Sequence, residues 1–154
     1  MQDIKKDPSR VRHRPKLSGL AATIQPAREA AARLERRAGR FEIYELLESI
    51  YRVYFDWRRC KKARRSAKVL ANELGIVRRK GMSPIRVLIE AILPEADLKQ
   101  KSRWVRALEY VHSEDVSPSQ FRKFIGGHGG VAGCAHLAVK ISRRRRRPGG
   151  DWND

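Results

Sequence analysis

Cysteine is nearly absent from the sequence. The 154 residues include only Cys60 and Cys134, which stand far apart and form no CxxC pair. Small secreted proteins that depend on disulfides contain many more cysteines, and structural zinc sites use closely spaced pairs. The scarcity of cysteine therefore argues against both classes and favours a reducing, intracellular environment.

Long apolar stretches are also missing. No segment approaches the ~18 consecutive apolar residues that suggest a membrane-spanning helix. The first twenty residues, MQDIKKDPSRVRHRPKLSGL, lack the apolar run of a secretory signal peptide. We therefore expect a cytoplasmic protein that has no membrane segment.

Acidic residues are scarce relative to basic ones. The chain has 17 Asp and Glu against 35 Lys and Arg, which gives a formal net charge of +18 and an isoelectric point near 10.9. Self-repulsion of this size disfavours a compact state unless an anionic partner screens it. An isoelectric point above ~9 is typical of nucleic-acid-binding domains. The charge balance therefore favours a nucleic-acid partner.

Patterns typical of β-strands are absent as well. No segment alternates apolar and polar residues between hairpin turns. Apolar residues instead recur at spacings of three and four, most clearly in FEIYELLESIYRVYFDW. In that segment the stripe consists of Ile43, Leu47, Ile50, Tyr54 and Trp57. The spacing predicts an all-α protein whose core includes this stripe.

The composition divides the chain into three parts. Residues 25–142 are predicted to form a compact bundle of six to seven helices. Residues 1–24 read as a basic disordered arm and residues 143–154 as an arginine-rich disordered tail, because neither has enough apolar area to order itself. The pattern leaves open whether residues 42–74 form one helix or two.

The segment VLANELGIVRRKGMSP, residues 69–84, resembles the middle of a helix-turn-helix motif. Such motifs join their helices by a turn of about three or four residues, whereas the stretch from Gly75 to Ser83 is nine residues long. The following segment, PIRVLIEAIL, is largely apolar and offers only Arg86 to read base edges. We predict instead two structural helices, the first ended by Gly75 and the second capped by Ser83.

Basic residues concentrate in three clusters, which are the predicted nucleic-acid contacts. The segment RRCKKARRSAK, residues 58–68, has seven basic residues and no acid. If this segment is helical, Arg58, Lys61, Lys62 and Arg65 share one side of the helix. The complete set of predicted contacts is Arg58, Arg59, Lys61, Lys62, Arg64, Arg65, Lys68, Arg78, Arg79, Lys80, Arg143, Arg144, Arg145, Arg146 and Arg147. A solvated basic surface without a ligand is the alternative interpretation.

The glycine-rich segment FIGGHGGVAGCAHLAVKI offers a second route to nucleic acid. Its GHGG sequence, residues 127–130, resembles the GxxG loop between two helices that contacts RNA in KH domains. The resemblance covers fewer than twenty residues, no flanking strand is predicted, and the loop contains no basic residue. A plain helix–helix turn is the alternative, so RNA binding through this loop is kept as a secondary hypothesis.

Catalytic and metal-binding patterns are not found. His112, His128, Cys134 and His136 lie within twenty-five residues, but Cys134 and His136 point to different sides of a helix. No nucleophile, phosphate-binding or dinucleotide-binding motif occurs. We expect neither enzymatic activity nor a cofactor or metal.

The chain as a whole resembles small basic proteins encoded on bacterial plasmids, phages and other mobile elements. We therefore expect a DNA-binding accessory or regulatory protein that acts mainly through phosphate contacts, with duplex DNA favoured over RNA. The main alternative is a helical adaptor or inhibitor that docks on an acidic protein partner. Its anchors would be aromatic side chains such as Tyr51, Phe55 or Trp152.

Overall fold

The structure of the protein is a computed structural model that describes residues 19–146. Within this range it contains eight α-helices and one short 3-10 helix, and no strand. The predicted all-α class is confirmed, but the predicted helix number of six to seven is too low. None of the helices in the described part of the chain combines the length and the apolar character that crossing a membrane requires.

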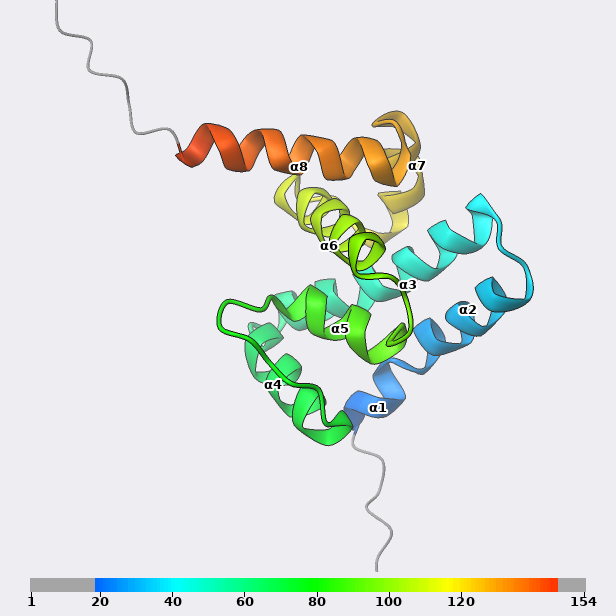
Figure 1. The fold of residues 1–154 in the computed structure, drawn as a ribbon, viewed down its shortest axis with the longest axis vertical. Helices are drawn as coiled ribbons and strands as arrows, with labels where there is room; N and C mark the ends of the chain where they lie inside the picture. The colour runs from blue at the N-terminus through cyan, green and yellow to red at the C-terminus, as the bar shows by residue number, and fades with distance from the viewer. Residues whose placement is uncertain (1–18, 147–154) are drawn as a thin grey trace, which may run out of the picture.

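The helices follow one another through short connections, except between α4 and α5. Their bounds are α1 (Gly19–Thr23), α2 (Gln25–Arg36), α3 (Arg40–Arg59), α4 (Ala63–Leu74), α5 (Pro84–Ile92), α6 (Leu98–Ser113), η1 (Pro118–Gln120), α7 (Phe121–Gly127) and α8 (Gly130–Arg146). Figure 1 shows α8 lying across α6 at one end of the molecule and α4 with α1 at the other. Helices α3 and α5 lie between them.

Two borders of the helical part differ from the prediction. Residues 19–23, expected in the N-terminal arm, form α1, and α8 continues through Arg143–Arg146, expected in the tail. The extension of α8 has a simple cause: Ala and Arg have high helix propensity, and the helix is already nucleated on α6. The rest of the predicted arm and tail, including Arg147 and Trp152, lies outside the described residues.

The core is built around α3, α5 and α6. The predicted stripe on α3 is inward: Leu47 and Ile50 are fully buried, and Tyr54 and Trp57 are nearly so. Helix α5 presents five buried residues among its nine, because it packs against α3, α4 and α6. Ser83 Oγ accepts a hydrogen bond from the backbone N–H of Arg86, so this side chain caps α5 as predicted.

Residues 42–74 form two helices, not one. Helix α3 ends in a Schellman motif, in which Lys62 N–H donates to Trp57 C=O and Lys61 N–H donates to Arg58 C=O. Lys61 takes the left-handed conformation that this motif requires, with φ of 55°. Glycine usually occupies that position, as Gly75 does at the end of α4. A lysine there gives no sequence signal for the break.

Candidate nucleic-acid interface

The three predicted basic clusters are exposed on the described surface. All side chains of the predicted set within residues 58–80 and 143–146 are exposed to solvent. None of them takes part in an ion pair within residues 19–146. Within residues 19–146, these cations are therefore not neutralised by an ion pair.

The first cluster lies on a bend and not on one continuous helix. Arg58 and Arg59 end α3, Lys61 and Lys62 lie in the turn, and the remaining three residues follow on α4. The expectation that Arg58, Lys61, Lys62 and Arg65 share one helical side is therefore wrong, because the Schellman motif redirects the chain after Arg59. The buried face of α4 consists of Ala63, Ala67, Leu70 and Ala71, which leaves Arg64, Arg65 and Lys68 on its outer side.

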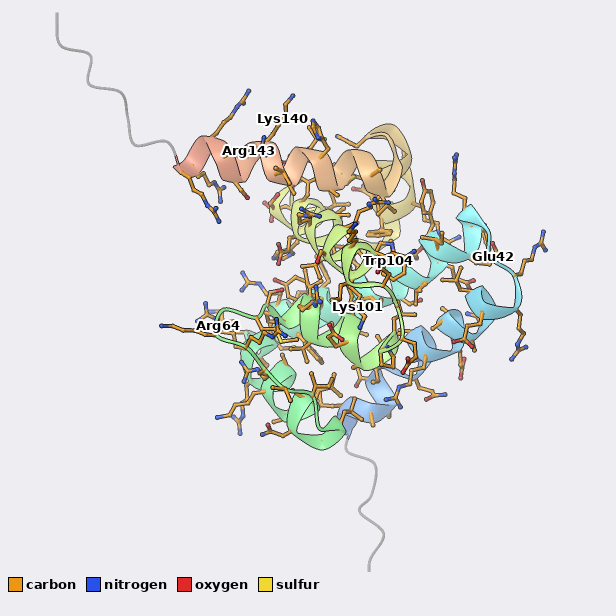
Figure 2. The ribbon with its side chains drawn as sticks, in the orientation of Figure 1. Glu42, Arg64, Lys101, Trp104, Lys140 and Arg143 are labelled. Carbon is orange, nitrogen blue, oxygen red and sulfur yellow. The ribbon has the colours of Figure 1, made fainter. Side chains whose placement is uncertain are left out.

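The second cluster, Arg78–Lys80, lies in the connection between α4 and α5. Figure 1 shows the connection between α4 and α5 passing over α4, and Figure 2 shows Arg64 extending outward from this edge. Gly81 has φ of 79° and turns the connection back toward α5. The bend and the connection are together called the α4 surface (residues 58–68 and 78–80).

A furrow connects the α4 surface to the arginines of α8. It consists of three adjoining hollows, the largest of about 750 Å³ beside Arg79 and Lys80. The middle hollow shares Arg86 and Ser102 with the first and Arg106 with the third, which ends at Arg143 and Arg146. The furrow therefore runs from the second cluster across α6 to the third.

Two carboxylates lie in the furrow. Glu90 pairs with Arg86 and Lys101, at 3.0 Å and 2.7 Å. Desolvation acts to raise the pKa of Glu90, but the hydrogen bonds and charges of Lys101 and Arg86 outweigh it and hold the pKa below its usual value. Burial raises the pKa of Glu109, although a hydrogen bond with Ser83 opposes the rise. The furrow is thus basic at both ends and closer to neutral in its middle.

Sequence reasoning missed Arg106, which lies on the outer side of α6 where the middle and third hollows meet. It stands alone between Val105 and Ala107, so no cluster marked it. Arg86, considered as a base reader, is half-buried and bonded to Glu90 and Ser102. Because α5 turns its apolar residues into the core, it cannot serve as an exposed recognition helix.

The glycine loop has structural roles that explain its composition. Gly129 and Gly130 have φ of 80° and 74°, which favour glycine. A Cβ on Gly133 would stand 2.0 Å from the carbonyl oxygen of His128, so α8 can begin this close to α7 only with glycine there. The sheet that accompanies a GxxG loop in KH domains is absent from residues 19–146.

The histidines and cysteines considered as metal ligands are mostly structural. His128 Nδ1 lies 2.7 Å from the carbonyl oxygen of Phe124 and its ring stacks on that phenylalanine. His112 packs edge-on against Tyr54, and desolvation lowers its pKa. Cys134 is buried, which raises its thiol pKa to about 11. Within residues 19–146 no three His, Cys, Asp or Glu side chains form a group suited to a metal ion.

Comparisons with protein-family models, with curated proteins and with solved structures found no match to this chain.

Proposed function

We propose that the protein binds nucleic acid through the α4 surface and the arginines of α8, with duplex DNA preferred over RNA. The observation that carries the proposal is the separation of charges: the ion-paired cations lie elsewhere, and the predicted cluster residues have no acidic partner in the described structure. Unpaired arginines and lysines on one surface repel one another, and a phosphate backbone relieves that repulsion.

Contacts to phosphates, without base readout, suit this surface best. The cations project from a bend, from the outer side of α4, from a loop and from the end of α8, so they do not form one recognition face along a single helix. Arginines at the end of α8 suit the narrow minor groove of A-tract DNA, which would give a preference for shape. A role as an accessory or regulatory protein of a bacterium or mobile element agrees with weak sequence selectivity.

The test is fluorescence anisotropy with labelled duplex DNA and single-stranded RNA across a salt series. If six to ten phosphates are engaged, duplex affinity falls by about three to five decades between 50 and 200 mM salt. RNA of equal length is expected to bind more weakly at each salt concentration. A shallow salt dependence, or no binding at low salt, would contradict the proposal.

RNA binding through the glycine loop is tested separately by substitution within it. Asp at Gly130 would be strained, because φ is positive and Tyr44 Oη stands 3.0 Å from the position of a Cβ. Gly127 has open space and an ordinary φ, so Gly127→Asp adds a negative charge without disturbing the fold. Unchanged RNA affinity in Gly127→Asp, with unchanged helical circular dichroism, would exclude this route.

Docking on an acidic protein partner is the second candidate function. Its predicted anchor Tyr51 is fully buried and donates a hydrogen bond to the carbonyl of Val116, so Tyr51 cannot serve. The observation that favours the candidate is instead an apolar mouth in the furrow, where Val77 is 84% and Leu98 67% exposed beside Arg79 and Lys80. A purified acidic partner should lose affinity for a Val77→Ser, Leu98→Ser variant whose DNA binding is unchanged.

A further inference from the structure

A hollow separate from the three of the furrow lies away from the α4 surface and shares no residue with that surface. It has a volume of about 740 Å³ and forms where the beginnings of α3, α6 and α8 meet. Pockets that bind small molecules usually enclose about 300–1,000 Å³. The hollow is therefore large enough for a ligand, and its lining indicates which kind.

Two arginines give the hollow a positive charge. Arg40, the first residue of α3, and Arg103, on the first half of α6, both line it and are both exposed. Neither arginine has an ion-pair partner within the described residues, and no acidic residue lines the hollow. Glu42, which is close in sequence to Arg40, is paired with Arg37. An anionic ligand would find two free guanidinium groups here.

The wall between the arginines is aromatic and carries unused hydrogen-bond donors. Trp104 is only 4% exposed and lines the hollow, next to Tyr44 and Ile43. Within residues 19–146 neither the indole N–H of Trp104 nor the hydroxyl of Tyr44 has a hydrogen-bond partner. A ligand with a planar ring and acceptor atoms fits this wall. Figure 2 labels Trp104, one of the lining residues, on α6.

The third side of the hollow is bare backbone. Gly129 and Gly130 line it, and Tyr44 Oη lies 3.0 Å from the position that a Cβ on Gly130 would occupy. Within α8 and its approach the N–H of Gly133 donates to Gly129 C=O. The amides of Val131 and Ala132, earlier in the same turn, have no acceptor within the helix. They add donors to a site that the arginines and the tryptophan already define.

We propose that this hollow binds a phosphorylated nucleotide. Arg40 and Arg103 hold the phosphate, and the base packs against the partly exposed Tyr44. A free mononucleotide and the 5′-phosphorylated end of a strand present the same chemistry. The proposal does not depend on the α4 surface, so either can fail without the other.

Isothermal titration calorimetry with adenosine 5′-monophosphate (AMP), adenosine and inorganic phosphate tests the proposal. AMP is expected to bind, with adenosine and phosphate each at least tenfold weaker, because each satisfies only one part of the site. The Arg40→Glu, Arg103→Glu variant is expected to bind AMP at least thirtyfold more weakly. The Lys123→Glu, Lys140→Glu variant is the matched control: it reverses two exposed charges that lie outside the hollow and in no ion pair of the described residues, and it should leave AMP binding unchanged.

Two further measurements test the role of Tyr44 and distinguish a free nucleotide from the 5′ end of a strand. Tyr44→Phe removes only a free hydroxyl and should weaken AMP severalfold in a protein with unchanged thermal unfolding. Short oligonucleotides with a 5′-phosphate or a 5′-hydroxyl distinguish the sources: a preference for the phosphate that disappears in the double arginine variant assigns a strand end, and no preference assigns a free nucleotide. Absence of AMP binding together with no preference for the 5′-phosphate, or equal AMP affinity in the arginine variant, would overturn the proposal.

Discussion

The two ends of α3 lie in opposite electrostatic surroundings. At its beginning, Glu42, Glu45 and Glu48 pair with arginines from α2, from α7 and from α3 itself. At its end, Arg58 and Arg59 continue into a run of cations with no acidic partner in the described structure. Arginines near the beginning of α3 thus form ion pairs, some of which join two helices, whereas the arginines at its end form none within the described residues. Net charge alone does not reveal this division.

The largest expected effect on DNA binding comes from reversing the charge of the unpaired cations that follow the end of α3. The Arg64→Glu, Arg65→Glu, Lys68→Glu variant should bind duplex DNA about a thousandfold more weakly at low salt, since three phosphate contacts are lost and repulsion is added. The slope of log K against log salt should fall by roughly 2.7, at 0.9 per phosphate. The measurement is an anisotropy salt series.

The control for that variant is Arg36→Glu, Lys99→Glu, Lys123→Glu. These three residues are also exposed, and they belong to no ion pair within residues 19–146 and lie outside the α4 surface. This control variant should lose much less affinity for duplex DNA than the variant of α4. Equal losses in the two variants would mean that binding follows total charge and not the α4 surface.

The ion pair between the buried Lys101 and Glu90 should contribute to the stability of the fold and not to DNA binding. Lys101 is only 3% exposed, and its ammonium bonds to Glu90 and to the carbonyl of Pro94. Glu90→Ala leaves that ammonium buried without its counter-charge and should lower the free energy of unfolding by about 3 kcal/mol, measured in urea. Lys101→Met, a chain of similar length, should cost less.

This pair also gives a pH dependence. Because the pKa of Glu90 is lowered in the folded state, its stabilisation is complete above the usual pKa near 4.5 and is lost as the pH falls through the folded value. Unfolding between pH 7 and pH 3 should therefore depend less on pH in Glu90→Ala than in the wild type. The same dependence in both would contradict the role assigned to the pair.

The arginines of α8 should contribute less than the α4 surface. Successive residues of a helix point about 100° apart, so only about two of Arg143–Arg146 can face one phosphate backbone. Replacing all four by Gln should weaken duplex binding roughly thirtyfold and lower the salt slope by about 2. An unchanged slope would remove α8 from the interface.

The ion pairs near the beginning of α3 can be removed, which leaves their arginines without an acidic partner. The Glu42→Gln, Glu45→Gln, Glu48→Gln variant releases the four paired arginines Arg33, Arg37, Arg52 and Arg122. It should raise non-specific DNA affinity about tenfold in the anisotropy assay. Its stability should fall by no more than about 1 kcal/mol per pair, because the arginines are partly exposed. Unchanged DNA affinity would show that the position of the cations matters more than their release.

The smallest effect is expected at the bend itself. Lys61→Gly removes a left-handed strain of roughly 1 kcal/mol and should stabilise the protein by up to that amount in urea unfolding. It also removes one cation of the α4 surface, so DNA affinity should fall severalfold. Lys61→Ala, which loses the charge but keeps the strain, should reproduce only the loss of affinity.

The elements that sequence predicts correctly are those marked by local chemistry. Gly75 ends α4, and Ser83 and Pro84 begin α5, because each of these residues has a distinct backbone or capping preference. The end of α3 carries no such mark: it uses Schellman hydrogen bonds, but with Lys61 in the left-handed position. Residue preference does not predict this end.

The candidate sites divide in the same way. The basic clusters are contiguous in sequence, so composition alone singles out their residues, and their role in binding stays a prediction. The hollow that holds Arg40, Arg103 and Trp104 was not predicted, because it assembles from three segments that only the fold brings together. Arg106 was missed for the same reason, since its place in the furrow comes from the packing of α6 against α8.

The packing of α8 affects how readily this helix unfolds locally. This helix packs chiefly on α6, with a smaller contact to α7, and within its described length only Cys134 and Ala135 are buried. Local opening needs less free energy where few apolar groups are buried. Amide protons in the second half of α8 should therefore exchange with deuterium well before those of α3 or α5, and bound DNA should slow them most of all.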